Sequence, residues 1–135
     1  MPRVSQSSGR CQPKRVRTEG NGPGRLRRNA ELEGVSGRVE VRTCDARALD
    51  LADASVDVVV SRLCLHNLPD EAGRHTAARE VARVLRPGGH VAISDLAGMA
   101  RIASWLNAEG LVVLTHQRTP GTFPPQRLLL ARRPS

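Results

Sequence analysis

The sequence predicts an α/β fold in which helices pack on a largely parallel sheet, preceded by a disordered N-terminal leader. The first observation is a strand–helix–strand unit over 56–95, whose apolar residues change from a strand pattern to a helical period and back. The second is a pair of strand-like segments within 111–131, separated by a Gly- and Pro-rich loop that favours an antiparallel hairpin. The third is a stretch over 1–25, rich in Ser, Gly, Pro, Arg and Gln, whose lack of periodicity predicts disorder.

The strand–helix–strand unit begins with Val56–Val60, an almost continuously apolar, β-branched run that is typical of a parallel strand covered on both faces. The next segment, 69–86, opens with a Pro-Asp start signal and is ended by Pro87-Gly88-Gly89, which predicts a helix. Its apolar residues recur at three- and four-residue steps: Ala72, Ala78, Val81, Val84 and Leu85. His90–Asp95 is the second buried strand, and the crossover between the strands is expected to be right-handed.

Two elements are predicted upstream of this unit. Leu26–Glu33 contains good helix formers and ends at Gly34, which suits the residue after a helix. Arg38–Thr43 alternates strictly between apolar and polar residues, which predicts a half-exposed strand at the edge of a sheet. The following 47–55 is a connection with room for a helical turn.

Downstream, a helix is predicted over 97–109, ended by Glu109-Gly110. Its apolar face is formed by residues at i, i+3, i+4 and i+7: Met99, Ile102, Ala103 and Leu106. Leu111–Thr115 and Gln126–Ala131 are the two strands of the hairpin.

Length and charge limit the function classes. The 135 residues allow one small domain. The formal charge of +8 is concentrated in the first 28 residues, where eight basic groups face one acidic group; the other 107 residues hold 13 basic and 12 acidic groups. Aromatic residues are limited to Trp105 and Phe123, whereas proteins that bind single-stranded nucleic acid stack bases on aromatic rings. The composition therefore argues against a nucleic-acid-binding surface on the folded part.

The three cysteines are an odd number without a CxxC pair, so they predict neither a disulfide framework nor a zinc site. The scattered histidines likewise predict no metal site. No apolar run approaches the roughly 18–20 residues of a membrane span, and the leader lacks the apolar core of a secretory signal. A cytoplasmic protein without membrane contact is predicted.

The basic leader over 1–25 has three interpretations. It is a solvated tail without a task, an organelle transit peptide, or an arm that contacts RNA or DNA phosphates through its arginines. The first of these is favoured, because the leader has too few apolar residues for the amphipathic helix of a transit peptide.

From about Leu26 to Arg132 the chain resembles the second half of a class I S-adenosylmethionine-dependent methyltransferase of the small-molecule "type 11" kind. The resemblance lies in the runs NAELEGVSGRVEVRTCDARAL, DVVVSRLCLHNL and REVARVLRPGGHVAISDL, followed by the hairpin. It implies a Rossmann-like sheet of order 3-2-1-4-5-7-6 in which only the seventh strand is antiparallel. Strands three to seven then correspond to Val39–Thr43, Val56–Ser61, Val91–Ser94, Leu111–Thr115 and Gln126–Ala131.

The resemblance also implies a first strand and a glycine-rich cofactor loop upstream of Leu26, together with a second strand whose acid takes the ribose. Such a loop works because glycines let the backbone approach the cofactor and the next helix offers free N–H groups. Here Gly20-Asn21-Gly22-Pro23-Gly24 matches the spacing only superficially, since no apolar strand precedes it. We therefore expect an N-terminally truncated copy of the domain, with 1–25 read from unrelated or out-of-frame coding sequence, and a partial sheet over 26–135.

The resemblance assigns seven residues to the site. Asp45 would accept a hydrogen bond from the adenine amino group and the Ala46 N–H would meet a ring nitrogen; alternatively, Asp45 only caps the following turn. Ser61 and Arg62 would line the methionine and sulfonium side of the cofactor. The residues expected to face a small-molecule methyl acceptor are Leu65, His66 and Asn67.

No catalytic residue is assigned firmly. His66 is the one side chain in this segment that could act as a general base near neutral pH, although a histidine just after a strand is more often a hydrogen-bonded structural residue. Methyl transfer needs little acid–base help, because the protein mainly aligns an in-line attack on an activated sulfonium. Asp57 and Asp95 are predicted to be structural and to fix strand ends.

Without the first two strands, the compact remainder should be a sheet of order 4-5-7-6 carrying the two helices predicted at 69–86 and 97–109. Val39–Thr43 should then either pair directly with the fourth strand, which is favoured, or remain loosely attached. Three functions stay open: a methyltransferase-family domain that uses S-adenosylmethionine on a small molecule, a catalytically inactive remnant or scaffold of that fold, and a nucleic-acid-binding module that uses the basic leader.

Overall fold

The structure, a computed structural model, describes residues 4–7 and 22–135. Its contacts divide the chain into two compact units, 1–49 and 50–135. Among the described residues, none of the helices is both long and apolar enough to cross a membrane.

The second unit contains a four-stranded sheet of order β3-β4-β6-β5. Its strands are β3 (Val56–Arg62), β4 (Leu85–Asp95), β5 (Val112–Thr119) and β6 (Gln126–Arg132). β3 and β4 run parallel, and β6 runs antiparallel to both β4 and β5. This confirms the predicted order 4-5-7-6 and the C-terminal antiparallel hairpin.

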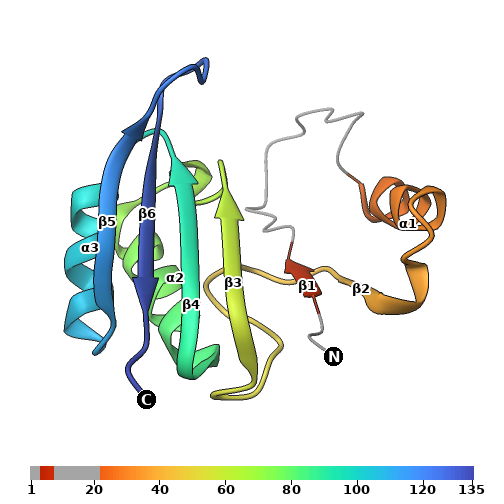
Figure 1. Ribbon diagram of the computed structural model, residues 1–135, viewed down its shortest axis with the longest axis horizontal. Coiled ribbons are helices and arrows are strands. Elements are labelled where there is room, and N and C mark those ends of the chain that lie inside the picture. The colour runs from red at the N-terminus through yellow and green to blue at the C-terminus, as the bar shows by residue number, and fades with distance from the viewer. Residues whose placement is uncertain (1–3, 8–21) are drawn as a thin grey trace. The chain divides into compact units, whose positions relative to one another are not determined.

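Two helices cover one face of this sheet, α2 (Glu71–Val84) and α3 (Met99–Ala108) (Figure 1). Both were predicted, with ends two residues or fewer from those observed. α2 begins after Asp70, whose Oδ1 accepts a hydrogen bond from the Gly73 N–H at 2.6 Å, as an N-cap residue does. The two helices and the inward face of β4 and β6 form the core: Ala77, Ala78, Val81, Ala82, Val84, Leu85, Val91, Ile93, Met99, Ile102, Leu106, Leu129 and Ala131.

The turn Pro87-Gly88-Gly89 lies within β4, where the pairing with β3 shifts register. Gly88 has a φ of +80°, which L side chains rarely adopt. A Cβ on Gly89 would lie 2.8 Å from the Arg86 carbonyl oxygen and from the Leu85 side chain. The two glycines are therefore required by the sharp change from helix to strand.

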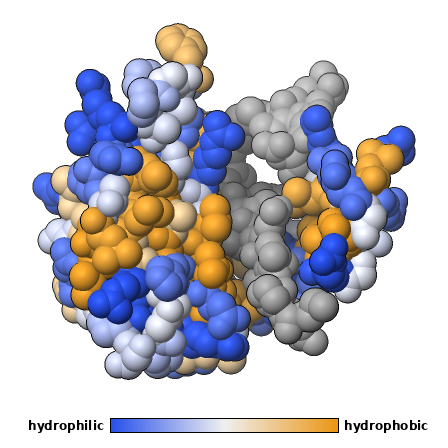
Figure 2. All heavy atoms as spheres, viewed as in Figure 1, coloured by the Kyte–Doolittle hydropathy of each residue, from blue (hydrophilic) through white to orange (hydrophobic). Residues whose placement is uncertain are grey.

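The other face of the sheet is open and apolar. The residues that expose large apolar side chains there include Val58 (56 % exposed) and Val60 (75 %) on β3 and Val112 (43 %) on β5. Leu114, 52 % exposed, occupies the position where β5 bulges against β6. Figure 2 shows apolar side chains gathered on the sheet face turned toward the viewer. The prediction that Val56–Val60 is covered on both faces was therefore wrong, because β3 ends the strand order and only one face carries helices.

The first unit contains β1 (Val4–Ser7), α1 (Pro23–Leu32), a 3₁₀ turn (Ser36–Arg38) and β2 (Val39–Arg42). β1 and β2 form a two-stranded parallel sheet, in which Val4 pairs with Val39 and Gln6 with Val41. The expected pairing of Val39–Thr43 with the fourth strand was wrong, since β2 takes Val4–Ser7 as its partner. The backbone N–H and C=O groups of β2 therefore pair with those of β1 and not with those of β3.

The leader is described only in part. The predicted disorder over 1–25 falls mostly on residues 1–3 and 8–21, which lie outside the described ranges. Val4–Ser7 forms a strand that the composition did not predict, and α1 starts at Pro23, three residues before the predicted start. Proline suits this first helical position because its missing N–H would have no partner there.

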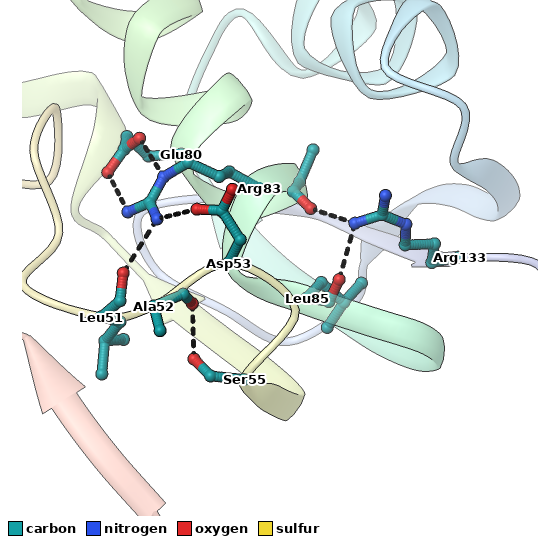
Figure 3. A network of polar contacts seen from close by, with 9 residues as sticks. Leu51, Ala52, Asp53, Ser55, Glu80, Arg83, Leu85 and Arg133 are labelled. Atoms are coloured by element: carbon teal, nitrogen blue, oxygen red, sulfur yellow. Dashed lines mark hydrogen bonds and ion pairs between the residues drawn. The ribbon is translucent and has the colours of Figure 1, made fainter.

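One arginine ties the connection before β3 to the last turn of α2 (Figure 3). Arg83 donates hydrogen bonds to both carboxylate oxygens of Glu80, at 2.7 and 2.8 Å. Its Nη1 also donates to the Leu51 carbonyl oxygen at 2.8 Å and to Asp53 Oδ1 at 2.6 Å. The bonds to Glu80, and next those to Asp53, hold the pKa of Arg83 above its ordinary value, so the guanidinium stays charged.

We expect Arg83→Met to lower the free energy of unfolding by about 1.5 kcal/mol, because it removes charged hydrogen bonds from a side chain that is partly shielded from water. Urea unfolding followed by circular dichroism measures this change. Arg101→Met is the matched control: in the part of the chain that the structure describes, Arg101 makes an exposed ion pair with Glu71, and its loss should cost below about 0.5 kcal/mol. Equal costs for the two variants would contradict the structural role of Arg83.

Candidate functional site

The candidate site in the second unit is the segment that follows β3. Arg62 at the end of β3 pairs in register with Ser94 of β4, so the carboxyl ends of these two parallel strands meet at one edge of the sheet. The chain then turns at Leu63, whose φ of +50° is unusual for a branched residue. The Leu63 N–H donates to the Ser94 carbonyl oxygen at 2.9 Å and so ties this turn to β4. A short 3₁₀ helix, η2 (Leu65–Asn67), comes next.

The carboxylate of Asp95 organises this segment. Asp95 ends β4 and has no exposed surface. Its Oδ2 accepts hydrogen bonds from the backbone N–H groups of Leu65, at 2.9 Å, and His66, at 3.2 Å. Its Oδ1 accepts from the Leu96 N–H at 2.8 Å and lies 2.5 Å from His66 Nδ1. One buried carboxylate thus joins the end of β4 to the turn after β3.

The two imidazole nitrogens of His66 differ in their contacts: Nδ1 is hydrogen-bonded to the Asp95 carboxylate, and Nε2 is not. An ionised carboxylate can only accept hydrogen bonds, so an ionised Asp95 pairs with the form of His66 that carries its proton on Nδ1. The His66 side chain is 27 % exposed, and among the described residues its Nε2 has no hydrogen-bond partner. His66 is therefore hydrogen-bonded, as the structural interpretation predicted, and it also keeps one ring nitrogen available.

The other residues predicted near the methyl acceptor differ in exposure. Leu65 is 3 % exposed and packs in the core. Asn67 is exposed, and its Nδ2 donates to the Leu63 carbonyl oxygen at 3.1 Å. Ser61 is half-buried, whereas Arg62 is exposed and has no ion-pair or hydrogen-bond partner among the described residues. Of this segment, His66, Asn67 and Arg62 present polar side chains to solvent.

Asp45 and Ala46 belong to the first unit, where they follow β2. Asp45 Oδ1 accepts a hydrogen bond from the Arg47 N–H at 2.8 Å, and its Oδ2 lies 2.6 Å from Arg47 Nη2. The Ala48 N–H donates to the Asp45 carbonyl oxygen at 3.0 Å, which closes the turn. Asp45 thus caps this turn, as its alternative interpretation predicted.

The contacts with Arg47 also set the charge of Asp45. The side-chain hydrogen bonds from Arg47, and next its backbone N–H, hold the pKa of Asp45 below the ordinary value, while burial opposes this weakly. The carboxylate is therefore ionised at neutral pH and can act only as an acceptor.

The structure brings His66, Leu65 and Asp95 together, and only the first two were predicted as site residues. The acid was interpreted as one that fixes a strand end, which the structure bears out in part. The sequence did indicate that Asp95 and His66 lie at the same edge of the sheet, because both lie at or after the carboxyl ends of adjacent parallel strands. Among the described residues, no group of three or more His, Cys, Asp or Glu could hold a metal ion.

Comparison with known proteins gives the family. A family model described as "Methyltransferase domain" matches residues 21–93. A 27-O-demethylrifamycin SV methyltransferase of Amycolatopsis mediterranei is 46 % identical over 61 residues, which are 45 % of this chain and 21 % of the relative. An arsenite methyltransferase of Aquipseudomonas alcaligenes is 37 % identical over 65 residues, 48 % of this chain and 18 % of the relative. The chain thus spans about a fifth of the length of these curated relatives.

Solved structures show the same fold. The N-methyltransferase NodS of Bradyrhizobium japonicum WM9, in complex with S-adenosyl-L-homocysteine, has a TM-score of 0.67 at 20 % identity; the match covers 82 % of this chain and 62 % of that one. The [4+2]-cyclase SpnF has a TM-score of 0.67 at 19 % identity, covering 79 % and 60 %. Because the family match extends over more than half of the chain and the sheet has the expected order, the chain belongs to the class I S-adenosylmethionine-dependent methyltransferase family.

Proposed function

We propose that this domain serves S-adenosylmethionine-dependent methyl transfer to a small molecule. The observation that carries the proposal is the segment Arg62–Asn67, which is held at the carboxyl edge of β3 and β4 by the buried Asp95. In open α/β sheets, ligands bind outside the carboxyl ends of the strands. At this edge the segment offers the Arg62 guanidinium and the His66 Nε2, neither of which has a hydrogen-bond partner within 4–7 and 22–135.

The acceptor class rests on the relatives. 27-O-demethylrifamycin SV and arsenite, the substrates in the names of two of them, are both small molecules and are chemically unlike each other. The shared family therefore supports a small-molecule acceptor and names no particular one.

The residues present suit parts of the cofactor. In the first unit, the ionised Asp45 is an acceptor-only group and suits a donor such as the adenine amino group, with the Ala46 N–H for a ring nitrogen. In the second unit, Arg62 suits a carboxylate such as that of the methionine part, beside Ser61. The only described residues before α1 are Val4–Ser7 and Gly22, so no glycine-rich loop is among the described residues.

The cofactor supplies a methyl group already activated on a sulfonium. The chain's own residues then have two tasks. Arg62 would hold the carboxylate end of the cofactor, and Asn67 and His66 would orient the acceptor. If the acceptor is an O–H or N–H group, it loses a proton on methylation, and His66 Nε2 accepts that proton.

Calorimetric titration of the whole chain with S-adenosylhomocysteine tests the proposal. We expect saturable binding that Arg62→Met weakens about tenfold, because the variant loses a charged hydrogen bond to the carboxylate. Arg132→Met is the control: it removes the same charge from the opposite end of the sheet, where Arg132 pairs with His90, and should leave binding unchanged. No heat at about 1 mM ligand, a concentration that half-saturates an interaction of about −4 kcal/mol, would contradict the proposal.

A second candidate function is a non-catalytic or differently catalytic member of the same fold. It is favoured by the likeness to a [4+2]-cyclase. Absence of S-adenosylhomocysteine binding in a folded chain would support this candidate over the first.

A further inference from the structure

The strongest unassigned feature of the fold is the double attachment of His66 to one buried carboxylate. Asp95 binds the backbone N–H of His66 through Oδ2 and its ring Nδ1 through Oδ1. Two bonds from one residue to one planar group restrict both the backbone turn and the rotation of the ring. A histidine that only filled space at a strand end would need neither.

We propose that Asp95 is a positioning residue that holds His66 in the tautomer protonated at Nδ1, so that Nε2 is the ring nitrogen left to accept a proton. The use of His66 Nε2 as a base rests on the proposed function, whereas the tautomer of His66 rests on the geometry alone. A buried carboxylate bonded to Nδ1–H is the device by which an imidazole is kept in the tautomer whose Nε2 can act as a base. Asp95 would thus act on the acceptor only through His66.

The hydrogen-bond count explains why the residue must be a carboxylate. Asp95 accepts from three backbone N–H groups, those of Leu65, His66 and Leu96, and none of these donors can reverse its role. Both oxygens of an ionised Asp95 accept backbone donors, and this ionised form has only acceptor sites left for the ring. His66 Nδ1 must then be the donor in the fourth bond.

Asparagine in place of Asp95 gives an opposite expectation. If the amide oxygen takes the Oδ2 position, it keeps the bonds to Leu65 and His66 N–H, and its NH₂ group meets the Leu96 N–H and His66 Nδ1. If the amide is reversed, its NH₂ group takes the Oδ2 position and faces two backbone donors, the N–H groups of Leu65 and His66, instead of the one from Leu96. The first orientation loses fewer hydrogen bonds, and it forces Nδ1 to become an acceptor. Asp95→Asn should therefore move the ring proton from Nδ1 to Nε2.

The test is long-range ¹H–¹⁵N NMR of the imidazoles in the full chain, which distinguishes a protonated from an unprotonated ring nitrogen. His66 is assigned by its loss in His66→Gln. Above the pH at which the ring deprotonates, we expect His66 to carry its proton on Nδ1 in the natural sequence and on Nε2 in Asp95→Asn. Asp57→Asn is the matched control, because Asp57 is an exposed carboxylate paired with Arg86 and should leave the His66 signals unchanged.

Two outcomes overturn the proposal. One is a natural-sequence His66 with the proton on Nε2 or shared between the nitrogens as in a free imidazole. The other is an Asp95→Asn variant that folds and keeps the proton on Nδ1. If Asp95→Asn does not fold, Asp95→Glu replaces it: a carboxylate should keep the Nδ1–H form, and a change of tautomer in this variant contradicts the proposal.

Titration with S-adenosylhomocysteine separates this inference from the proposed function. Asp95→Asn leaves Arg62 and Asp45 intact, so its affinity should stay within about twofold of the natural sequence, a change of roughly 0.4 kcal/mol. If the natural sequence does not bind the ligand, the proposed function fails while the tautomer measurement still decides the positioning role. If it binds and the tautomers do not invert, only the positioning role fails.

Discussion

Asp95→Ala is expected to lower the free energy of unfolding by about 3 kcal/mol, because it leaves one buried and two partly buried backbone donors without an acceptor. Those donors are the N–H groups of Leu65, His66 and Leu96, and Leu65 itself is 3 % exposed. The variant also removes the side-chain bonds from Asp95 to the turn after β3, while the backbone bond from the Leu63 N–H to the Ser94 carbonyl oxygen remains. Urea unfolding at neutral pH, followed by circular dichroism, measures the change, and loss of the cooperative transition would count as an effect of at least this size.

Two variants show where the stabilisation comes from. His66→Ala removes only the ring and keeps the three backbone bonds to Asp95, so we expect a cost of about 1 kcal/mol. Asp57→Ala breaks an exposed ion pair with Arg86 and should cost below about 0.5 kcal/mol. A cost of Asp95→Ala no larger than that of Asp57→Ala would mean that the described hydrogen bonds do not form in solution.

The elements of the second unit were predictable because their local patterns agree with their tertiary roles. The helical period over 69–86 and the Asp70 start signal both correspond to α2. The hairpin forms as predicted, but β5 continues to Thr119, beyond the predicted end at Thr115, so the loop before β6 is shorter than predicted. The strand order followed from the family resemblance and from the hairpin rather than from any single residue. Pattern and topology therefore agree wherever one face of an element is buried.

The partner of β2 was not predictable in the same way. Val39 and Val41 alternate with polar residues. This pattern predicts a strand with one apolar face, but it does not predict which other strand pairs with it. Strands pair through backbone groups that every sequence carries, and β1 contributes the polar sequence VSQS with a single apolar residue. A strand that short and polar has no pattern by which it could be recognised.

The chemistry of Asp95 was only half predictable. An acid at the end of a buried strand was expected to fix that strand end, and its hydrogen bond to the Leu96 N–H does so. Its contact with His66 spans 29 residues and depends on the register of β3 against β4. Periodicity identifies elements but not register, so the pairing of acid and histidine needed coordinates.

Ile93→Ala is expected to lower the free energy of unfolding by about 3 to 4 kcal/mol, since it removes a buried branched side chain and leaves a cavity. Ile93 has no exposed surface and lies on β4, between Ser61 of β3 and Leu129 of β6. Its strand is paired with β3 on one side and β6 on the other, so relaxation around the cavity is limited. Denaturant unfolding measures the loss, and Ile93→Val, with one methylene removed, should cost about 1 kcal/mol.

Val60→Ala is the matched control on the opposite face of the same sheet. Val60 pairs with Ala92 of β4, one residue before Ile93, but is 75 % exposed. Its truncation removes little buried area, so about 0.5 kcal/mol of lost strand propensity is expected. A cost near that of Ile93→Ala would mean that the apolar face carrying Val58 and Val60 is covered in solution. A small cost together with a large one at Ile93 would show that α2 and α3 supply the core on which the site edge depends.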